Sequence, residues 1–206
     1  IPFMAAAFLN LSPDHLDYHG DMSSYGQAKA RLFHELMAPG ATAVINIDDE
    51  GGRQLVADLS REQCPIAVWT LSLEDEAADV RFSAIEQTTM GCMGTLETPM
   101  GQVEIRSPLL GDFNAANIAC AAALARVVGI DASAITAGLS RAQVPGRLQT
   151  VENERDLTIV VDYAHSVDAI ERVLATLTAI ATGRVWCLFG CGGDRDRLKR
   201  APMGGA

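Results

Sequence analysis

Residues 10–29 read NLSPDHLDYHGDMSSYGQAK, and this stretch separates an apolar segment from an amphipathic one. The apolar run at 3–9 predicts a buried strand, and residues 11–20 predict a loop. From Asp21 the apolar side chains recur at helical spacing, which predicts a helix that ends near Met37. The loop is therefore expected at the carboxyl end of a strand, where open α/β sheets bind their ligands.

This connection is rich in side chains that carry chemistry. The loop holds two carboxylates and two imidazoles: Asp14, His15, Asp17 and His19. On the helix, Lys29 lies one turn from Tyr25 and one turn from Phe33, so its stem is expected among apolar groups. An amine that is partly removed from water is more reactive and more easily modified. On residue types alone, a solvated loop and a surface lysine with a packed stem remain alternatives.

Beyond this helix, strands and helices are predicted to alternate. Gly40 interrupts the pattern, and strands are expected at 41–47 and 66–71, with a helix over 48–60 between them. The order strand, helix, strand, helix, strand implies a parallel sheet with right-handed crossovers. Three short segments separated by Gly and Pro then predict an antiparallel meander: 80–87, 91–98 and 102–106.

An alanine-rich helix is predicted to begin near Gly111. Asn114 and Asn117 are three residues apart, so both amides lie on one face of its first turn, although polar residues are also ordinary there. A second helix is expected at Ala132–Leu139. Val144-Pro145-Gly146-Arg147 then breaks the pattern. We expect a domain boundary at this point, with one domain over residues 1–143 and a second over residues 144–206.

The second domain is predicted to begin with a strand pair, 148–152 and 157–162. The later strand delivers Asp162 and His165 to its carboxyl end, before a helix that Ser166 can cap. A further strand is expected at 184–189, and it leads into GCGGDRD at 190–196. Arg195 stands where a dinucleotide-binding fingerprint requires Gly or Ala, so the spacing fails that fingerprint and a plain glycine-rich turn is the alternative.

Composition restricts the class of protein. The chain has 206 residues, 49% hydrophobic and 20% charged, which is typical of a globular protein, and its net charge of −10 argues against binding to nucleic acid or anionic membranes. Five cysteines without C-x-x-C spacing, together with no signal peptide, indicate a reduced, cytoplasmic setting. The sequence has no G-x-x-x-x-G-K-[ST] phosphate loop, and both ends interrupt predicted elements, so we expect an internal piece of a longer protein.

Four motifs in order resemble the Mur ligase family, most closely its MurE branch: DHLDYHGDMSSYGQAKARLF at 14–33, GDFNAAN at 111–117, DYAH at 162–165 and GCGGDRD at 190–196. The resemblance implies an α/β fold. Its first part would be the later portion of the central ATP-binding domain, with a mostly parallel sheet and a small antiparallel meander. Its second part would be the start of a Rossmann-like C-terminal domain.

The resemblance also implies a function in peptidoglycan synthesis, and thus in cell wall biogenesis, cell shape and cell division. The parent protein would be an acid–amino-acid ligase that uses ATP and Mg²⁺. Its partners would be UDP-N-acetylmuramoyl-L-Ala-D-Glu and an amino acid, and the GGDRD segment favours meso-diaminopimelate over lysine. No nucleic acid or membrane partner is implied.

Residue roles follow from the same resemblance. His15 would help to hold one magnesium ion and a carbamylated Lys29 would support a second, and Lys29 and Arg147 would act in catalysis. The nucleotide would be bound by Asn114, Asn117, Arg147, Asp162 and His165. Arg195 would bind a carboxylate of the incoming amino acid. The chain departs from the family pattern at Ser166-Val167, where Thr-Pro is usual, and at Ala201, which separates Arg200 from Pro202.

Three other functions remain open from the sequence. Another Mur-type ligase, such as MurF or folylpolyglutamate synthetase, would share these motifs. A metal-dependent hydrolase could use His15, Asp17 and His19, but a binuclear site needs more imidazoles. Lastly, the 206-residue segment itself is expected to be inactive for lack of a phosphate loop, and to self-associate through an exposed sheet edge.

Overall fold

The computed structural model of the chain describes residues 2–12, 16–155, 157–191 and 200–205. A three-stranded parallel sheet forms its N-terminal part, with β1 (Phe3–Phe8), β2 (Met37–Asn46) and β3 (Ala67–Leu71) in the order β1-β2-β3. Between the strands lie α2 (Met22–Glu35) and α3 (Glu50–Arg61). The predicted parallel sheet and its crossover helices are therefore confirmed.

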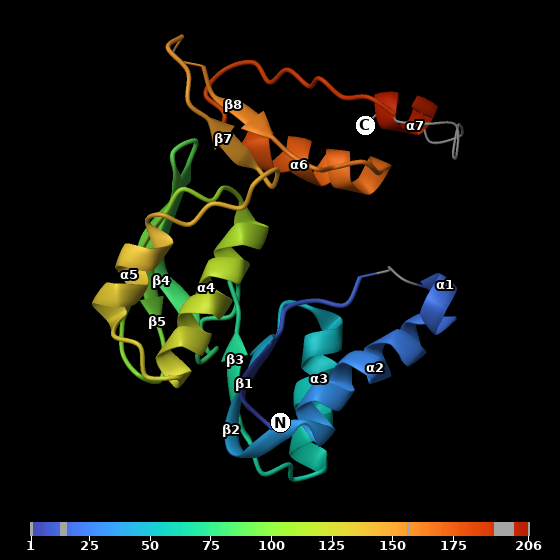
Figure 1. Cartoon of the computed structure of the whole chain (residues 1–206), viewed down its shortest axis with the longest axis vertical. Coiled ribbons are helices and arrows are strands. Elements are labelled where there is room, and N and C mark those ends of the chain that lie inside the picture. Colours follow the sequence, from blue (N-terminus) through green and yellow to red (C-terminus); the bar gives the residue numbers. More distant parts are fainter. Residues whose placement is uncertain (1, 13–15, 156, 192–199, 206) are drawn as a thin grey trace.

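Alternation along β2 places the two faces of this sheet against different helices. Ala43 and Ile45 face a core that includes Phe33 of α2 and Leu55 of α3. Val44 points to the opposite face and packs in a second core with α4 (Asp112–Val127). Figure 1 shows α2 and α3 together on one side of the sheet and α4 on the other. The sheet is thus covered by helices on both faces, which is why β2 reads as a nearly continuous apolar run.

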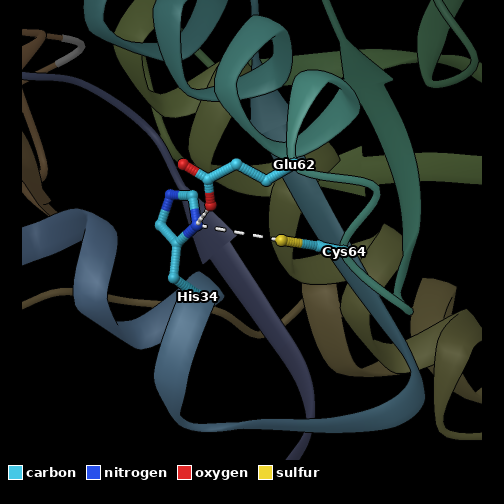
Figure 2. A group of neighbouring side chains, drawn as sticks. All are labelled: His34, Glu62 and Cys64. Carbon is cyan, nitrogen blue, oxygen red and sulfur yellow. Dashed lines mark hydrogen bonds and ion pairs between the residues drawn. The ribbon is translucent and has the colours of Figure 1, made fainter.

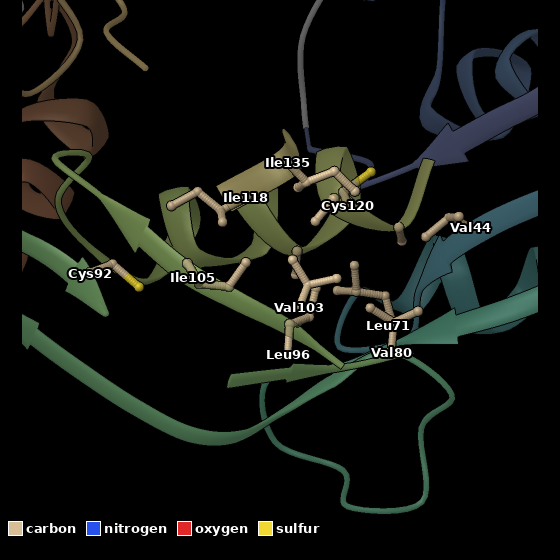
Figure 3. Close-up of a cluster of buried hydrophobic side chains, with 13 residues drawn as sticks. Val44, Leu71, Val80, Cys92, Leu96, Val103, Ile105, Ile118, Cys120 and Ile135 are labelled. Atoms are coloured by element: carbon tan, nitrogen blue, oxygen red, sulfur yellow. The ribbon is translucent and has the colours of Figure 1, made fainter. Parts of the chain in front are cut away.

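The second core joins the parallel sheet to the predicted antiparallel meander. The meander consists of β4 (Arg81–Thr88), β5 (Gly91–Glu97) and β6 (Val103–Ser107), and it is confirmed by antiparallel pairing throughout. α5 (Ala132–Leu139) packs beside it. Figure 3 shows side chains from the meander, both helices and the parallel sheet meeting in this core: Val44, Leu71, Leu96, Val103, Ile105, Ile118 and Ile135.

The C-terminal part is smaller. β7 (Gln149–Val151) and β8 (Ile159–Val161) form the predicted antiparallel pair, followed by α6 (Val167–Ile180) and α7 (Arg200–Gly205). α6 packs against the start of α4, since a Cβ on Gly111 would lie 2.4 Å from Cγ2 of Thr176. Within the described residues, no helix has both the length and the apolar character needed to cross a bilayer.

Three predicted elements differ from the structure. The predicted loop at 11–20 contains a one-turn helix, α1 (Leu16–His19). β2 starts at Met37 rather than residue 41, because Gly40 adopts a φ of 78° and allows the strand to bulge between its pairings with Phe3 and Ala5. No strand is formed at 184–189 by the described residues, and Trp186 and Leu188 there are 81% and 100% exposed.

Candidate functional site

Lys29 lies on the predicted helix, α2, and its side chain reaches the carboxyl end of β1. Its Nζ donates a hydrogen bond to the backbone oxygen of Asn10 at 2.7 Å. The same nitrogen is 5.2 Å from the ring centres of both Phe8 and Tyr25. The two aromatic faces favour a cation between them, so the side chain is held in one place while remaining partly exposed.

An open pocket of about 430 Å³ surrounds this amine. Its walls come from the end of β1 and from the part of α2 beside it: Ala7, Phe8, Leu9, Asn10, Ala28, Lys29, Leu32 and Phe33. Asp21 caps α2 by accepting a hydrogen bond from the Ser24 N–H at 2.7 Å, which lowers the pKa of the Asp21 carboxyl. The cap fixes where the helix begins, and therefore the turn on which Lys29 lies.

The backbone that Lys29 meets is held by side chains at the end of β2. Asn46 donates to the Leu9 oxygen at 3.0 Å, and Asp49 accepts from the Leu11 N–H at 3.1 Å. The other oxygen of Asp49 caps α3 by accepting from Gly52 N–H at 3.3 Å. Sequence reasoning assigned Asp49 only to the helix start. In the structure it also fixes the connection that carries the Lys29 acceptor.

Of the two carboxylates and two imidazoles in the loop before α2, which include the predicted magnesium ligand His15, only the His19 side chain is described. Asp14, His15 and the side chain of Asp17 lie outside the described residues. His19 is described, and its ring stacks on Tyr25 with centres 4.9 Å apart and planes inclined by 24°. Since Tyr25 also faces Lys29, the aromatic ring links the end of α1 to the amine.

Asn114 and Asn117 meet on one face of α4, as predicted. The Nδ2 of Asn117 donates to Oδ1 of Asn114 at 3.3 Å, and Nδ2 of Asn114 donates to the Leu110 oxygen at 2.8 Å. Asn114 is buried, so its amide is used to hold the start of the helix. Asn117 is exposed and presents the rest of its amide to solvent.

Arg147, Asp162 and His165 are brought together at the junction of the two parts. The Arg147 guanidinium lies 5.1 Å from the ring centre of Tyr163. Nδ1 of His165 is 3.0 Å from the backbone oxygen of Tyr163. Asp162 accepts from the Leu148 N–H at 2.8 Å and from the Ala164 N–H at 2.7 Å. The carboxylate therefore ties the junction to the end of β8.

The predicted site residues thus occupy three places: Lys29 beside β1, the two asparagines at the start of α4, and the Arg147–His165 group at the junction. Arg195 lies outside the described residues. Two thiols near this framework, Cys92 and Cys120, are buried, and burial raises the pKa of Cys92 and raises that of Cys120 to about 11. Such thiols are packing groups and not nucleophiles.

Comparison with known families identifies two matching regions. Residues 1–125 match the Mur ligase middle domain, and residues 146–206 match the Mur ligase glutamate ligase domain. Among curated proteins, the UDP-N-acetylmuramoyl-L-alanyl-D-glutamate–2,6-diaminopimelate ligase of Geobacter metallireducens is 46% identical over 98% of this chain. The same ligase of Gloeobacter violaceus is 45% identical over 98% of it. The chain spans 40% of the length of each relative.

Solved structures show the same similarity. A structure of UDP-N-acetylmuramoyl-L-alanyl-D-glutamate–2,6-diaminopimelate ligase superposes with a TM-score of 0.76 at 36% identity, covering 98% of this chain and 41% of its own. MurF from Acinetobacter baumannii gives a TM-score of 0.70 at 22% identity, covering 85% of this chain and 37% of its own. At that identity the second similarity supports the shared fold alone.

Proposed function

The chain belongs to the Mur ligase family, and from this premise we propose that it is part of an ATP-dependent ligase that adds meso-diaminopimelate to UDP-N-acetylmuramoyl-L-alanyl-D-glutamate. The observation that carries the proposal is the 46% identity to a diaminopimelate ligase over 98% of the chain. MurF and folylpolyglutamate synthase structures are only 18–24% identical, so they favour no second function. The parent protein would act in peptidoglycan synthesis in the cytoplasm.

The proposed reaction has two steps. The γ-phosphoryl group of ATP is first transferred to the substrate's free carboxylate, which gives ADP and an acyl phosphate. The amine of diaminopimelate then attacks the acyl carbon, so that a C–N bond forms, the C–O bond to phosphate breaks, and the amine loses a proton. Both steps bring anionic groups together, so the residues must position the reactants and offset negative charge.

Lys29 is proposed to act as a carbamate in this site. Its neutral amine would add to CO₂ and release a proton, and the carbamate would offer two oxygens, the ligand type that Mg²⁺ prefers. The pocket beside β1 leaves an open side for the added group on Nζ, and carbamylation would replace the cation that Phe8 and Tyr25 flank with an anion that magnesium neutralises. His15 would help to hold another magnesium ion, and the two ions would neutralise phosphate charge.

The junction is proposed to bind the nucleotide. Arg147 is exposed and lies over Tyr163, so its guanidinium can turn toward a phosphate and stabilise the transferring group. Asn114, Asn117 and His165 would contact the nucleotide. Asp162 would act by holding the 162–165 turn, since both of its oxygens already accept backbone hydrogen bonds. Arg195 would bind a carboxylate of diaminopimelate.

The proposal is tested with the longer parent protein, supplied with the UDP-muramoyl-dipeptide and MgATP. We expect a tripeptide product with meso-diaminopimelate, detected by mass spectrometry. Lysine should replace it poorly, and D-alanyl-D-alanine or glutamate should give no product. A parent protein that prefers one of the last two acceptors would contradict the assignment and place the chain with the MurF or folylpolyglutamate branch.

The 206-residue chain itself is proposed to be inactive and to self-associate. Its sequence offers no phosphate loop to hold the β- and γ-phosphates. β1 is at the edge of its sheet, and Phe3 and Met4 on it are 48% and 60% exposed. An exposed apolar edge strand favours pairing with another chain. Size-exclusion chromatography should give an apparent mass above 21.9 kDa, and a strictly monomeric chain would contradict this part.

A further inference from the structure

A second cluster of metal-ligating side chains lies at the far end of α2. It consists of His34 in the last turn of α2, Glu62 at the end of α3, and Cys64 in the turn before β3. One ligand atom from each residue lies within 4.8 Å of the other two. Figure 2 shows the three side chains pointing toward one another from these separate segments. Lys29 lies more than one turn earlier on α2 and its Nζ donates to Asn10, so the cluster shares no side chain with the proposed magnesium site.

Glu62 and Cys64 converge on the same atom of His34. Nδ1 of His34 is 2.8 Å from Oε2 of Glu62 and 3.8 Å from Sγ of Cys64. A catalytic Cys–His–carboxylate triad needs the thiol on one ring nitrogen and the carboxylate on the other. Because Glu62 and Cys64 both face Nδ1 of His34, the three residues cannot form such a triad. Their arrangement instead places an imidazole nitrogen, a carboxylate oxygen and a thiol sulfur around one point.

We propose that His34, Glu62 and Cys64 bind a zinc ion. Typical bond lengths of about 2.3 Å to sulfur and about 2.1 Å to nitrogen and oxygen imply tetrahedral ligand separations of roughly 3.6 Å for S···N and roughly 3.4 Å for N···O. The observed 3.8 Å and 2.8 Å require only a small outward movement of Glu62, whose side chain is 56% exposed. The mixture of nitrogen, sulfur and oxygen donors suits Zn²⁺ and does not suit Mg²⁺.

The backbone holds two of these ligands in place. Gln63 has a φ of 52°, a left-handed conformation in which a glycine is usual at a helix end. The Gln63 N–H donates to the backbone oxygen of Ser60 at 3.3 Å, and the Cys64 N–H donates to the backbone oxygen of Leu59 at 3.2 Å. These two hydrogen bonds form a Schellman motif. This motif directs Glu62 and Cys64 to the same side, toward His34. The site is therefore largely formed before any ion binds.

Zinc bound here would clamp the end of α2 to the turn between α3 and β3. On binding, the Cys64 thiol would lose its proton to solvent and form a Zn–S bond. Nδ1 of His34 would give up the proton that it shares with Glu62, so that the neutral ring carries its proton on Nε2 and Nδ1 binds the ion, with water in the fourth position. The partial exposure of His34, at 23% for the side chain, leaves a path for that water. The inference rests on this cluster alone and not on the proposed ligase activity.

The test is zinc binding by the reduced 206-residue chain, measured by competition with a chromophoric chelator. We expect one equivalent of zinc, and cobalt at the same site should show thiolate-to-metal charge-transfer absorption. Cys64→Ser and His34→Gln should each lower the affinity by about 100-fold or more, and Glu62→Gln by about tenfold or more, since even outer-shell changes cost roughly 10–100-fold. Zinc should raise the melting temperature of the wild type and of neither Cys64→Ser nor His34→Gln.

Two variants serve as matched controls. Glu35→Gln changes the residue that follows His34, and the Glu35 carboxylate pairs with Arg31 at 2.9 Å rather than with the cluster. Cys187→Ser removes an exposed thiol in the C-terminal part. Both should bind zinc within about threefold of the wild type. Failure of the wild type to bind zinc would overturn the proposal, and so would undiminished binding in Cys64→Ser and His34→Gln, because other thiols would then hold the ion.

Discussion

Replacing Asp162 is expected to destabilise the junction between the two parts of the chain. Its carboxylate accepts two backbone hydrogen bonds, from Leu148 at 2.8 Å and from Ala164 at 2.7 Å. Leu148 is 1% exposed and has a φ of 42°, a conformation that costs free energy for a non-glycine residue. The hydrogen bond that Asp162 accepts from the Leu148 N–H therefore helps to keep a buried, strained peptide in place.

The magnitude follows from the two lost hydrogen bonds. A hydrogen bond to a charged group contributes about 1.5–3 kcal/mol, and the lower figure applies because Asp162 is only half-buried. Asp162→Ala removes both acceptors and should lower the free energy of unfolding by about 3 kcal/mol. Asp162→Asn keeps one acceptor oxygen and should cost about half as much.

Urea unfolding followed by tryptophan fluorescence measures this effect. Trp69 reports on the parallel sheet, and Trp186 reports on the C-terminal part. Glu152→Ala removes an exposed carboxylate just beyond β7 and serves as the control, with an expected change within about 0.5 kcal/mol. If Asp162→Ala were as stable as that control, Asp162 would not hold the junction, and its carboxylate would be free for a direct role toward the nucleotide.

Three other changes test the account at separate points. Lys29→Ala in the parent protein should abolish ligation without rescue by bicarbonate, and turnover at the wild-type rate would rule out the carbamate. Arg195→Lys should raise the KM for diaminopimelate strongly and leave that for ATP nearly unchanged, because an ammonium cannot form two parallel hydrogen bonds to a carboxylate; an unchanged KM for diaminopimelate would refute the role. Gly52→Ala should lower the free energy of unfolding by about 3 kcal/mol in urea, since the new Cβ would lie 1.9 Å from the backbone oxygen of Asn46. At Gly138 in α5 a new Cβ would have no atom within 4 Å, so Gly138→Ala should leave the free energy of unfolding unchanged or raise it. If both substitutions changed the free energy of unfolding equally, the contact at Gly52 would not be tight.

The sheets were predictable from the sequence because their signals are local. β2 and β3 are apolar runs separated by a helical pattern, and each strand of the meander is bounded by Gly or Pro. The one-turn helix α1 is too short to produce a period. The segment 184–189 has the composition of a strand, but pairing depends on a neighbouring strand, which composition does not reveal.

The candidate site was predictable only as a set of residue types at element ends. Asp162 could be placed at the carboxyl end of a strand and Lys29 on the helix that follows one, but their backbone partners, Leu148 and Asn10, could not. The zinc cluster was missed for a similar reason. His34 and Cys64 are 30 residues apart, and the left-handed turn that directs Cys64 toward His34 occurs at a glutamine, which carries no local signal for that conformation.

We propose that this chain supplies part of a diaminopimelate ligase and that it does not carry out the reaction by itself. ADP formation tests it most directly, measured side by side for the 206-residue chain and the longer parent protein with MgATP, the UDP-muramoyl-dipeptide and meso-diaminopimelate. The account predicts steady-state ADP formation by the parent that requires both the UDP-muramoyl-dipeptide and diaminopimelate, and none by the 206-residue chain. Substrate-dependent ADP formation by the 206-residue chain, or its absence with the parent, would contradict the claim.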